Sequence, residues 1–229
     1  MKRFTHFMTA GLMLCLFVFA SSCKTEAPAE ETAKTIPSAS YKAILVKHSM
    51  AAYPVFKDVY MAHDSMRQAY GISSMFIGRG TEDTNTVIVM NRISDLPKAK
   101  EFAASPDLKM AMEKAGVTGL PTITFLDVVR DDTSSITQND RLMVVHRVKE
   151  YDAWLKVYDG EGTAKRAENG LVDRGLARDV DDANKVYIVF AVMDKEKAMA
   201  RMQSPELTKL MADAGVEGEP TFFYYTLQK

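Results

Sequence analysis

The stretch AGVTGLPT at residues 115–122 recurs as AGVEGEPT at 214–221, an offset of 99 residues. The same offset relates many other positions on both sides of this motif. Agreement at one fixed spacing over such a length is the signature of an internal repeat. The matched positions include Gly71 with Gly170, Arg79 with Arg178, Asp83 with Asp182, Asn85 with Asn184, Ser105-Pro106 with Ser204-Pro205, and Met112 with Met211. The sequence therefore predicts two copies of one domain.

The N-terminus has the pattern of a secretory signal peptide. Lys2 and Arg3 precede a mostly apolar run at 7–20, which is shorter than the roughly 20 residues that span a bilayer comfortably. The sequence that follows, ASSC at 20–23, resembles a bacterial lipobox, which implies cleavage before Cys23 and lipidation of its thiol. We therefore expect residues 1–22 to be removed. The alternatives are a plain secretory signal followed by a free Cys23, or an uncleaved signal anchor.

Residues 23–40 are expected to form a flexible tether. Ala, Glu, Thr, Pro, Ser and Lys dominate this segment, and Ile36 is its one large aliphatic residue. Such a composition buries too little apolar surface to offset the entropy lost on ordering. The lipid on Cys23 would hold the protein at a membrane of the cell envelope. Lys24 stands where an Asp would retain a lipoprotein in the inner membrane of enteric bacteria, so we expect the outer membrane rather than the inner one.

Composition excludes several classes of function. The chain has 29 basic and 30 acidic residues; loss of Lys2 and Arg3 with the signal peptide would leave 27 basic against 30 acidic, a net charge of −3. Without a cluster of basic residues, this balance argues against nucleic acid as a partner. The common phosphate-loop, dinucleotide, zinc-protease and serine-hydrolase motifs are all missing from the sequence. We therefore expect no metal and no cofactor.

Each repeat predicts the element order β-α-β-β-α-β, which is that of the ferredoxin-like fold. The second helix of each copy is interrupted at Ser-Pro, where Ser is a good N-cap and Pro suits the first helical turn. The expected domains are repeat 1 at 41–129, a linker at 130–140, and repeat 2 at 141–229. In repeat 1 we expect a strand at 43–50, a helix at 53–70, a hairpin at 72–93, a helix from the Asp95 cap to 104, a helix at 108–115 and a strand at 122–129; in repeat 2, the same elements at 142–148, 151–168, 171–193, 195–203, 205–214 and 222–227.

The strand at 186–193, VYIVFAVM, is apolar on both faces. A strand of this kind is normally covered on both sides, whereas the helices of one repeat can cover only one face. The sheet of the other repeat is the nearest cover for the second face. We therefore expect the two sheets to pack into one barrel within a monomeric chain, so that a single chain forms a pseudo-dimer.

The second repeat resembles the dimeric α/β-barrel superfamily, in particular small domains related to antibiotic biosynthesis monooxygenases. The resemblance rests on HRVKEYDAW at 146–154, on Gly170, and on the stretch from Ser204-Pro205 to Pro220. The first repeat keeps His48, Tyr53 and Gly71 but has Phe56 in place of Trp154. The resemblance implies an α+β fold with two tandem ferredoxin-like repeats. The superfamily contains cofactor-free oxygenases, haem-degrading enzymes, dismutase-like and cyclase-like members, and domains of no known activity.

The candidate ligand-binding residues lie on the strands. His48 and His146 hold matching positions in the first strand of each repeat, where a His could act as an acid or a base, or could be a hydrogen-bonded core residue. Lys47 and Arg147 point to the opposite face and replace the histidines as candidates if that face lines the barrel. Arg79 and Arg178 could bind a carboxylate or enolate, or could instead pair with Asp83 and Asp182 in the adjoining turns.

Other polar and aromatic residues are interpreted as structural. Phe56, Tyr60, Trp154 and Tyr158 have the spacing of a helix core face, and no catalytic residue can be assigned. Haem-degrading relatives use a His on a helix, and we interpret His63, the one such His, as a surface residue. Haem degradation is therefore not supported.

The function that these observations favour is the binding of a small, largely apolar molecule between the two sheets. We expect the site to be asymmetric, with His146 of the second repeat as its main polar residue and His48 as the counterpart. The alternatives are a cofactor-independent monooxygenase or cyclase-like enzyme in the same cavity, and a non-catalytic interaction protein of the envelope whose barrel is filled by side chains.

Overall fold

The computed structural model describes residues 36–228. The expected signal peptide, Cys23 and most of the expected tether therefore lie outside the described residues. The described part contains eight strands and seven helices. In chain order they are β1 (Ser38–Met50), α1 (Tyr53–Ala62), α2 (Asp64–Ala69), β2 (Ile72–Gly80), β3 (Thr86–Ile93), α3 (Leu96–Ala103), α4 (Pro106–Lys114), β4 (Val117–Asp131), β5 (Asp140–Val148), α5 (Tyr151–Glu168), β6 (Leu171–Asp179), β7 (Lys185–Val192), α6 (Lys195–Met202), α7 (Pro205–Asp213) and β8 (Val216–Gln228).

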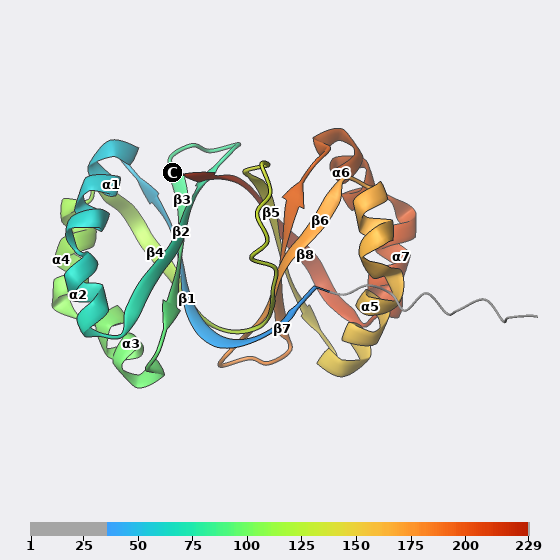
Figure 1. The fold of residues 1–229 in the computed structure, drawn as a ribbon, viewed down its shortest axis with the longest axis horizontal. Coiled ribbons are helices and arrows are strands. Elements are labelled where there is room, and N and C mark those ends of the chain that lie inside the picture. Colours follow the sequence, from blue (N-terminus) through green and yellow to red (C-terminus); the bar gives the residue numbers. More distant parts are fainter. Residues whose placement is uncertain (1–35, 229) are drawn as a thin grey trace, which may run out of the picture. The chain divides into compact units, whose positions relative to one another are not determined.

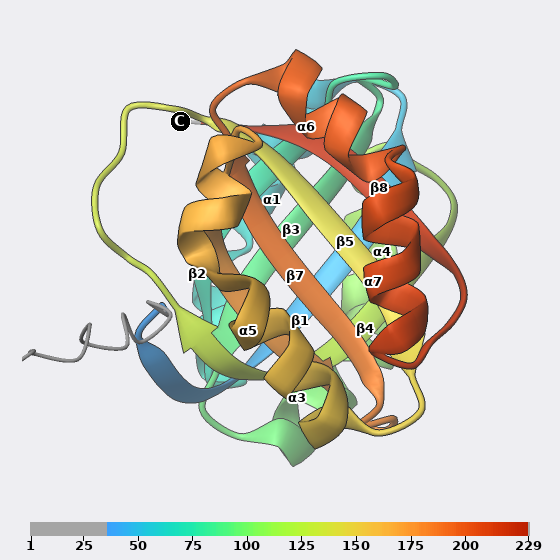
Figure 2. The same ribbon diagram turned by 90° about the vertical axis from the view of Figure 1, so that its right-hand side faces the viewer.

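The strands form one closed barrel in the order β1-β3-β2-β8-β5-β7-β6-β4, and β4 returns to pair with β1. All neighbouring strands are antiparallel. Helices α1–α4 cover one side of the barrel and α5–α7 cover the opposite side, as Figures 1 and 2 show. The result is an α+β fold in which a continuous sheet lies between two helical layers.

Two seams join the first half of the chain (β1–β4) to the second half (β5–β8). Strand β2 pairs with β8, and β4 pairs with β6. The seams differ in length, because β8 meets β2 only at Ile77–Gly80, whereas β4 follows β6 from Gly175 to Asp179. The edge of β2 before Ile77 therefore has a strand neighbour only on its β3 side within the described residues.

The element order β-α-β-β-α-β occurs in both halves, with each helical position filled by one or two helices. The expected helix caps are present, because each capping side chain accepts a hydrogen bond from the backbone N–H three residues on. The pairs are Asp95 with Lys98 and Ser105 with Leu108 in the first half, and Asp194 with Lys197 and Ser204 with Leu207 in the second. The predicted caps at Asp95, Ser105 and Ser204 are confirmed, and Asp194 caps the corresponding helix of the second half.

Strand β7 is buried on both faces, as its sequence predicts. Val186, Ile188 and Phe190 pack against the helices of the second half. Tyr187 faces the other way and packs inside the barrel, where Leu45 and Ile88 of the first half also lie. The barrel interior is thus an apolar core that both halves share.

Three strands begin earlier than expected. Strand β1 starts at Ser38, inside the expected tether, and β4 and β8 start at Val117 and Val216, inside the repeated motif itself. In β4 the motif forms a bulge, because Lys47 pairs with Thr122 and Ser49 with Thr118 while residues 119–121 are passed over. Gly119 has a φ of 72° in this bulge. Pro121 lacks a backbone N–H and therefore suits a position without a ladder hydrogen bond. In the sequence, a strand with a bulge of this kind has the Gly and Pro residues that are typical of a turn.

The long first helix is also interrupted. The single helix expected at 53–70 is two helices that meet at His63, whose φ and ψ are −93° and 16°. In α5 the matching interruption is Gly162, with φ 78° and ψ 155°. Among α1–α7, none combines the length and the hydrophobicity that a membrane-spanning helix requires.

Candidate functional site

Three cavities are relevant to ligand binding. One lies inside the barrel and has a volume of about 180 Å³. The second, of about 80 Å³, lies in the first half between the sheet and helices α1, α2 and α4, and we call it the first-half cavity. The third, of about 70 Å³, lies at the matching place in the second half and is the second-half cavity.

Most charged groups at the cavity inside the barrel are paired with other side chains, and Arg141 donates instead to the backbone carbonyls of Gln138 and Asp140. Arg130 binds Asp159 through two nitrogens at 2.5 and 2.8 Å, and Arg174 lies 3.2 Å from Asp132. Tyr41 donates a 2.7 Å hydrogen bond to Asp131. The remaining lining is mostly apolar. This cavity therefore offers a ligand volume but few unpaired polar groups.

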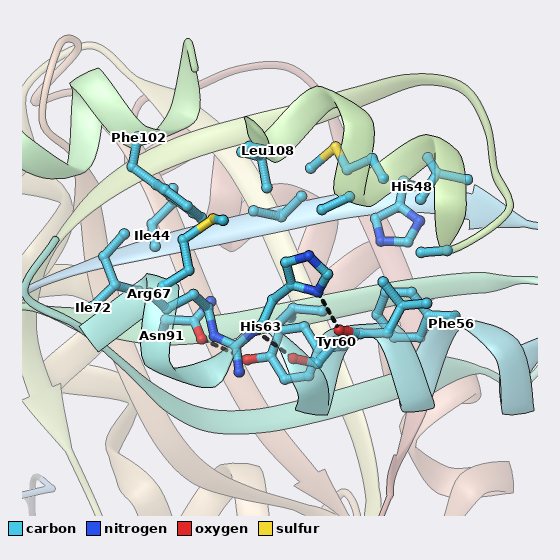
Figure 3. A pocket seen from close by; sticks show the side chains of 18 residues that line it. Ile44, His48, Phe56, Tyr60, His63, Arg67, Ile72, Asn91, Phe102 and Leu108 are labelled. Carbon is cyan, nitrogen blue, oxygen red and sulfur yellow. Dashed lines mark hydrogen bonds between the residues drawn. The ribbon is translucent and has the colours of Figure 1, made fainter. Parts of the chain in front are cut away.

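The first-half cavity has an apolar wall with a cluster of polar side chains on one side. Figure 3 shows Phe102 and Leu108 on one side, with Tyr60, Asn91 and Arg67 gathered opposite them. The ring of His63 lies between these two sides in the same view. A largely apolar cavity with a few converging polar groups is the usual form of a small-molecule site.

Tyr60 and Asn91 form the centre of the polar side. The Tyr60 hydroxyl donates a 2.6 Å hydrogen bond to Asn91 Oδ1 and lies 2.7 Å from Ser74 Oγ. Asn91 is 4% exposed, on the helix-facing side of β3. Burial raises the pKa of Tyr60 above its ordinary value, so the phenol stays protonated at neutral pH and remains a donor.

Two histidines present a ring nitrogen that can accept a proton. His63 Nδ1 lies 2.8 Å from the carbonyl of Val59, and His48 Nδ1 lies 3.2 Å from the carbonyl of Ser49. A carbonyl only accepts, so Nδ1 carries the proton in each neutral ring and Nε2 keeps its lone pair. Burial lowers the pKa of His48, which favours its neutral form.

Arg67 is buried in the wall of this cavity and is 5% exposed. Its Nη1 donates to the Tyr60 carbonyl at 2.6 Å, and its Nη2 lies 3.0 Å from Asp64. The guanidinium also stacks on the Tyr60 ring, with 3.7 Å between the Cζ atom and the ring centre. Within residues 36–228 its Nε has no hydrogen-bond partner. Arg67 Nε is therefore a buried hydrogen-bond donor that belongs to a cationic group and has no acceptor among the described residues.

The second-half cavity has a different polar side, made of an ion-pair network. Arg166 Nε lies 2.9 Å from Asp173, which also accepts the Tyr158 hydroxyl. Glu161 lies 3.2 Å from Arg166 and 2.6 Å from Arg201. Asp173 is 2% exposed, and both arginines are 5% exposed. The charged groups of this cavity thus satisfy one another, whereas the His146 ring that also lines it has no hydrogen-bond partner among the described residues.

The expectation that His48 and His146 lie between the sheets is wrong. His48 packs against Phe56 of α1 and His146 against Trp154 of α5, with ring centres 5.0 and 5.5 Å apart. Both side chains therefore face the helices, because strand alternation directs Ile44, Val46 and His48 to the same side. His146 also differs from a hydrogen-bonded core residue, since neither of its ring nitrogens has a partner in the described part of the chain.

Lys47 and Arg147 point the opposite way from the histidines, as expected. The Lys47 ammonium lies 4.2 Å from the centre of the Phe223 ring, on the barrel side of the sheet. Arg147 is 59% exposed and binds Asp182 at 2.7 Å. Neither residue lines any of the three cavities.

Arg79 and Arg178 bind the turns of their own hairpins, but they do not bind the carboxylates of Asp83 and Asp182 as expected. Arg79 Nε donates to the carbonyl of Thr84 at 2.5 Å, and Arg178 Nε donates to that of Ala183 at 2.7 Å. Both guanidinium groups lie over a tyrosine ring at the start of a helix. The turn geometry presents the backbone carbonyl rather than the Asp side chain to each arginine.

His63, Arg67 and Asn91 are the cavity residues that the sequence analysis missed. His63 is half-buried at the junction of α1 and α2, rather than on the surface as expected. The sequence could have indicated Arg67, because an arginine, Arg166, occupies the matching position 99 residues later. Asn91 carried none, since its repeat partner is Phe190.

Comparison with solved structures identifies similar folds at low sequence identity. An anthrone oxidase-like protein matches with a TM-score of 0.60 and 14% identity, over 84% of this chain and 95% of that chain. A "putative monooxygenase" from Fusobacterium nucleatum matches with a TM-score of 0.55 and 13% identity, over 83% and 94%. Another "putative monooxygenase", from Lactobacillus acidophilus, matches with a TM-score of 0.52 and 13% identity, over 82% and 94%.

These three structures share the fold of this chain. No protein-family model matches the sequence, and no curated protein matches it. At such identities the likeness concerns the fold alone, and the function has to be argued from the site.

Proposed function

We propose that this protein binds a small, largely apolar molecule in the first-half cavity. The observation that carries the proposal is the contrast between the halves. In the second half, buried ion pairs satisfy the charged groups beside the cavity, although the His146 ring, which also borders it, has no hydrogen-bond partner within residues 36–228. In the first half, a buried guanidinium nitrogen has no partner within residues 36–228, and two histidines keep a free lone pair. Unused polar groups beside an apolar cavity favour a ligand there.

This proposal differs in place from the site expected from the sequence. The barrel interior is larger, but most charged side chains at its border bind other side chains, and Arg141 donates to two backbone carbonyls. The expected main residue, His146, borders a cavity whose polar side is occupied by ion pairs. The roles of His48 and His146 in binding stay a prediction. Of the two, His48 borders the cavity that we favour.

A matched pair of cavity-filling variants tests the proposal. Ala115 borders the first-half cavity and Ala214 borders the second, at the same position after a helix. We expect Ala115→Leu to weaken binding of a neutral aromatic probe, benzamide, by about tenfold or more, because the added carbons occupy the cavity. Ala214→Leu should leave binding unchanged at a similar cost in stability.

NMR titration of the purified protein measures both affinities, and native mass spectrometry would detect a ligand that co-purifies. Equal weakening by the two variants would contradict a site in the first half. Benzamide binding that neither variant affects would place the site elsewhere in the chain.

A second candidate function is cofactor-independent oxygenation in the same cavity. Two observations favour it: the likeness to proteins described as an anthrone oxidase-like protein and monooxygenases, and the lone pair on His63 Nε2, which could take a proton from an acidic substrate. Oxygen uptake with a phenolic substrate, lost in His63→Gln while binding persists, would support catalysis over binding alone.

We further propose that the mature chain begins at a lipidated Cys23 and is anchored in the cell envelope. Support comes from the signal-like N-terminus and the lipobox-like sequence that ends at Cys23. Cys23→Ser is expected to abolish partitioning into the detergent phase, because the acyl chains supply the anchor. A variant that still partitions, with its N-terminal segment attached, would indicate a signal anchor instead.

The two halves are, we propose, tandem ferredoxin-like repeats that form within one chain the barrel that single-domain relatives form as homodimers. The recurring element order and the two seams between the halves support this. With both seams closed inside the chain, no strand of a second copy is needed to complete the sheet. The chain should then be a monomer in light scattering.

A further inference from the structure

The two halves differ at one position that decides the charge beside each cavity. In the second half, Asp173 of β6 provides a buried carboxylate between Arg166 and Tyr158. At the repeat offset of 99, the first half has Ser74 of β2, and Arg67 corresponds to Arg166. The first half thus keeps the arginine and lacks the aspartate.

The two arginines are held in the same orientation. Arg166 Nη1 donates to the carbonyl of Tyr158 at 2.8 Å, and Arg67 Nη1 donates to the carbonyl of Tyr60 at 2.6 Å. Each guanidinium also stacks on the ring of that tyrosine. Arg166 Nε points at Asp173, at 2.9 and 3.1 Å from its two oxygens. In the same orientation, Arg67 Nε is directed toward the place where a residue 74 carboxylate would lie.

Ser74 does not fill that place. Its Oγ lies 3.3 Å from Arg67 Nη2 and 2.7 Å from the Tyr60 hydroxyl, but it is not bonded to Nε. Asp64, which pairs with Nη2, is on the outer side of α2 with a side chain that is 42% exposed. Arg67 is therefore a buried cation whose inward donor lacks the anion that its counterpart has.

The same place is open to solvent in the first half. Ser74 and Met75 are exposed, whereas Asp173 is buried. Neither Ser74 nor Asp173 is paired across a seam in the described part of the chain, because β2 meets β8 only from Ile77 and β6 meets β4 only from Gly175. The buried Arg67 guanidinium thus borders the first-half cavity and also lies beside an exposed residue, with 3.3 Å between its Nη2 and Ser74 Oγ.

We propose that the ligand of the first-half cavity is a small apolar carboxylic acid whose carboxylate takes the place that the Asp173 side chain takes in the second half. This inference rests on the proposed function of the cavity and adds the chemical class of the ligand. The carboxylate accepts from Arg67 Nε, while the apolar remainder packs against Phe102 and Leu108. A carboxylate adds the attraction of opposite charges to its hydrogen bond with the buried guanidinium, which selects an acid over a neutral molecule of the same shape.

Benzoate and its neutral analogue benzamide test this selection by NMR or calorimetric titration. We expect the protein to bind benzoate about tenfold or more tightly than benzamide. Ser74→Asp supplies the missing carboxylate within the chain, so it should remove the preference for benzoate. Ser74→Asn adds a side chain of the same size without the charge. It should keep the preference even if both probes bind more weakly.

Each outcome separates this inference from the function on which it rests. Equal affinity for the two probes in the unmodified protein would overturn the acid class and leave the cavity as a binding site. An unchanged preference in Ser74→Asp would overturn the place assigned to the carboxylate. Failure of both probes to bind would contradict the proposed function itself. Arg67→Gln offers a further readout, since it should reduce the preference to about one if the protein folds.

Discussion

Replacing Asp173 with alanine is expected to lower the free energy of unfolding by about 3–5 kcal/mol. Asp173 is 2% exposed and accepts hydrogen bonds from Arg166 and Tyr158. Its removal leaves the Arg166 guanidinium, itself 5% exposed, with Glu161 as its remaining ion-pair partner within residues 36–228. Removing one partner of a buried pair costs far more than the pair contributes, because the remaining charge stays desolvated. Urea denaturation at pH 7 measures the loss.

Ser74→Ala is the matched control for this prediction, because Ser74 holds the corresponding position in the first half. Ser74 is exposed and uncharged, so the loss should stay within about 0.5–1 kcal/mol. Similar losses for the two variants would mean that Asp173 does not hold a buried charge in place. The comparison also shows whether the halves have diverged in stability as they have in charge.

Much of the fold was readable from the repeat and from local chemistry. The caps at Asp95 and Ser105, the hairpin at 72–93 and the two covered faces of β7 all follow from residue type and spacing. These features depend on contacts within a few residues or on one simple pattern. The bulge at Gly119–Pro121 is not predicted, and the strand is expected only from residue 122. Gly and Pro are typical of a turn and of a bulged strand alike.

The candidate site was harder to predict, for two physical reasons. The alternation of β1 places His48 and Lys47 on opposite faces, but the sequence does not say which face meets the helices. The polar side of the first-half cavity also combines Tyr60, Arg67 and Asn91 from three separate elements. Their meeting depends on the break at His63. The sequence does contain one indication of the site. Ser74 and Asp173 hold matching positions, and an arginine lies at the same distance before each of them. This contrast indicates a site only once the structure shows that both arginines are buried.

Acidification is expected to destabilise the protein through His146. Burial lowers the pKa of His146 from 6.5 to about 4, because the ring is enclosed beneath Trp154. Between these two values the unfolded chain binds more protons than the folded one, so the stability that His146 contributes is complete above about pH 6.5 and is lost as the pH falls toward 4. At about 1.4 kcal/mol for each pKa unit, the loss by pH 4.5 should be about 2–3 kcal/mol. Urea denaturation at pH 7 and pH 4.5 measures it.

His146→Leu isolates this effect from the other groups that titrate in the same range. Neither ring nitrogen of His146 has a partner within residues 36–228, so an apolar side chain of similar size should cost less than about 1.5 kcal/mol at pH 7. The variant has no imidazole to protonate, and its loss of stability between pH 7 and pH 4.5 should be smaller by about 2–3 kcal/mol. An acid sensitivity that equals that of the unmodified protein would show that His146 is not the group that titrates. A large loss at pH 7 would show instead that the ring has a polar role, because a leucine can replace its packing but not its hydrogen bonding.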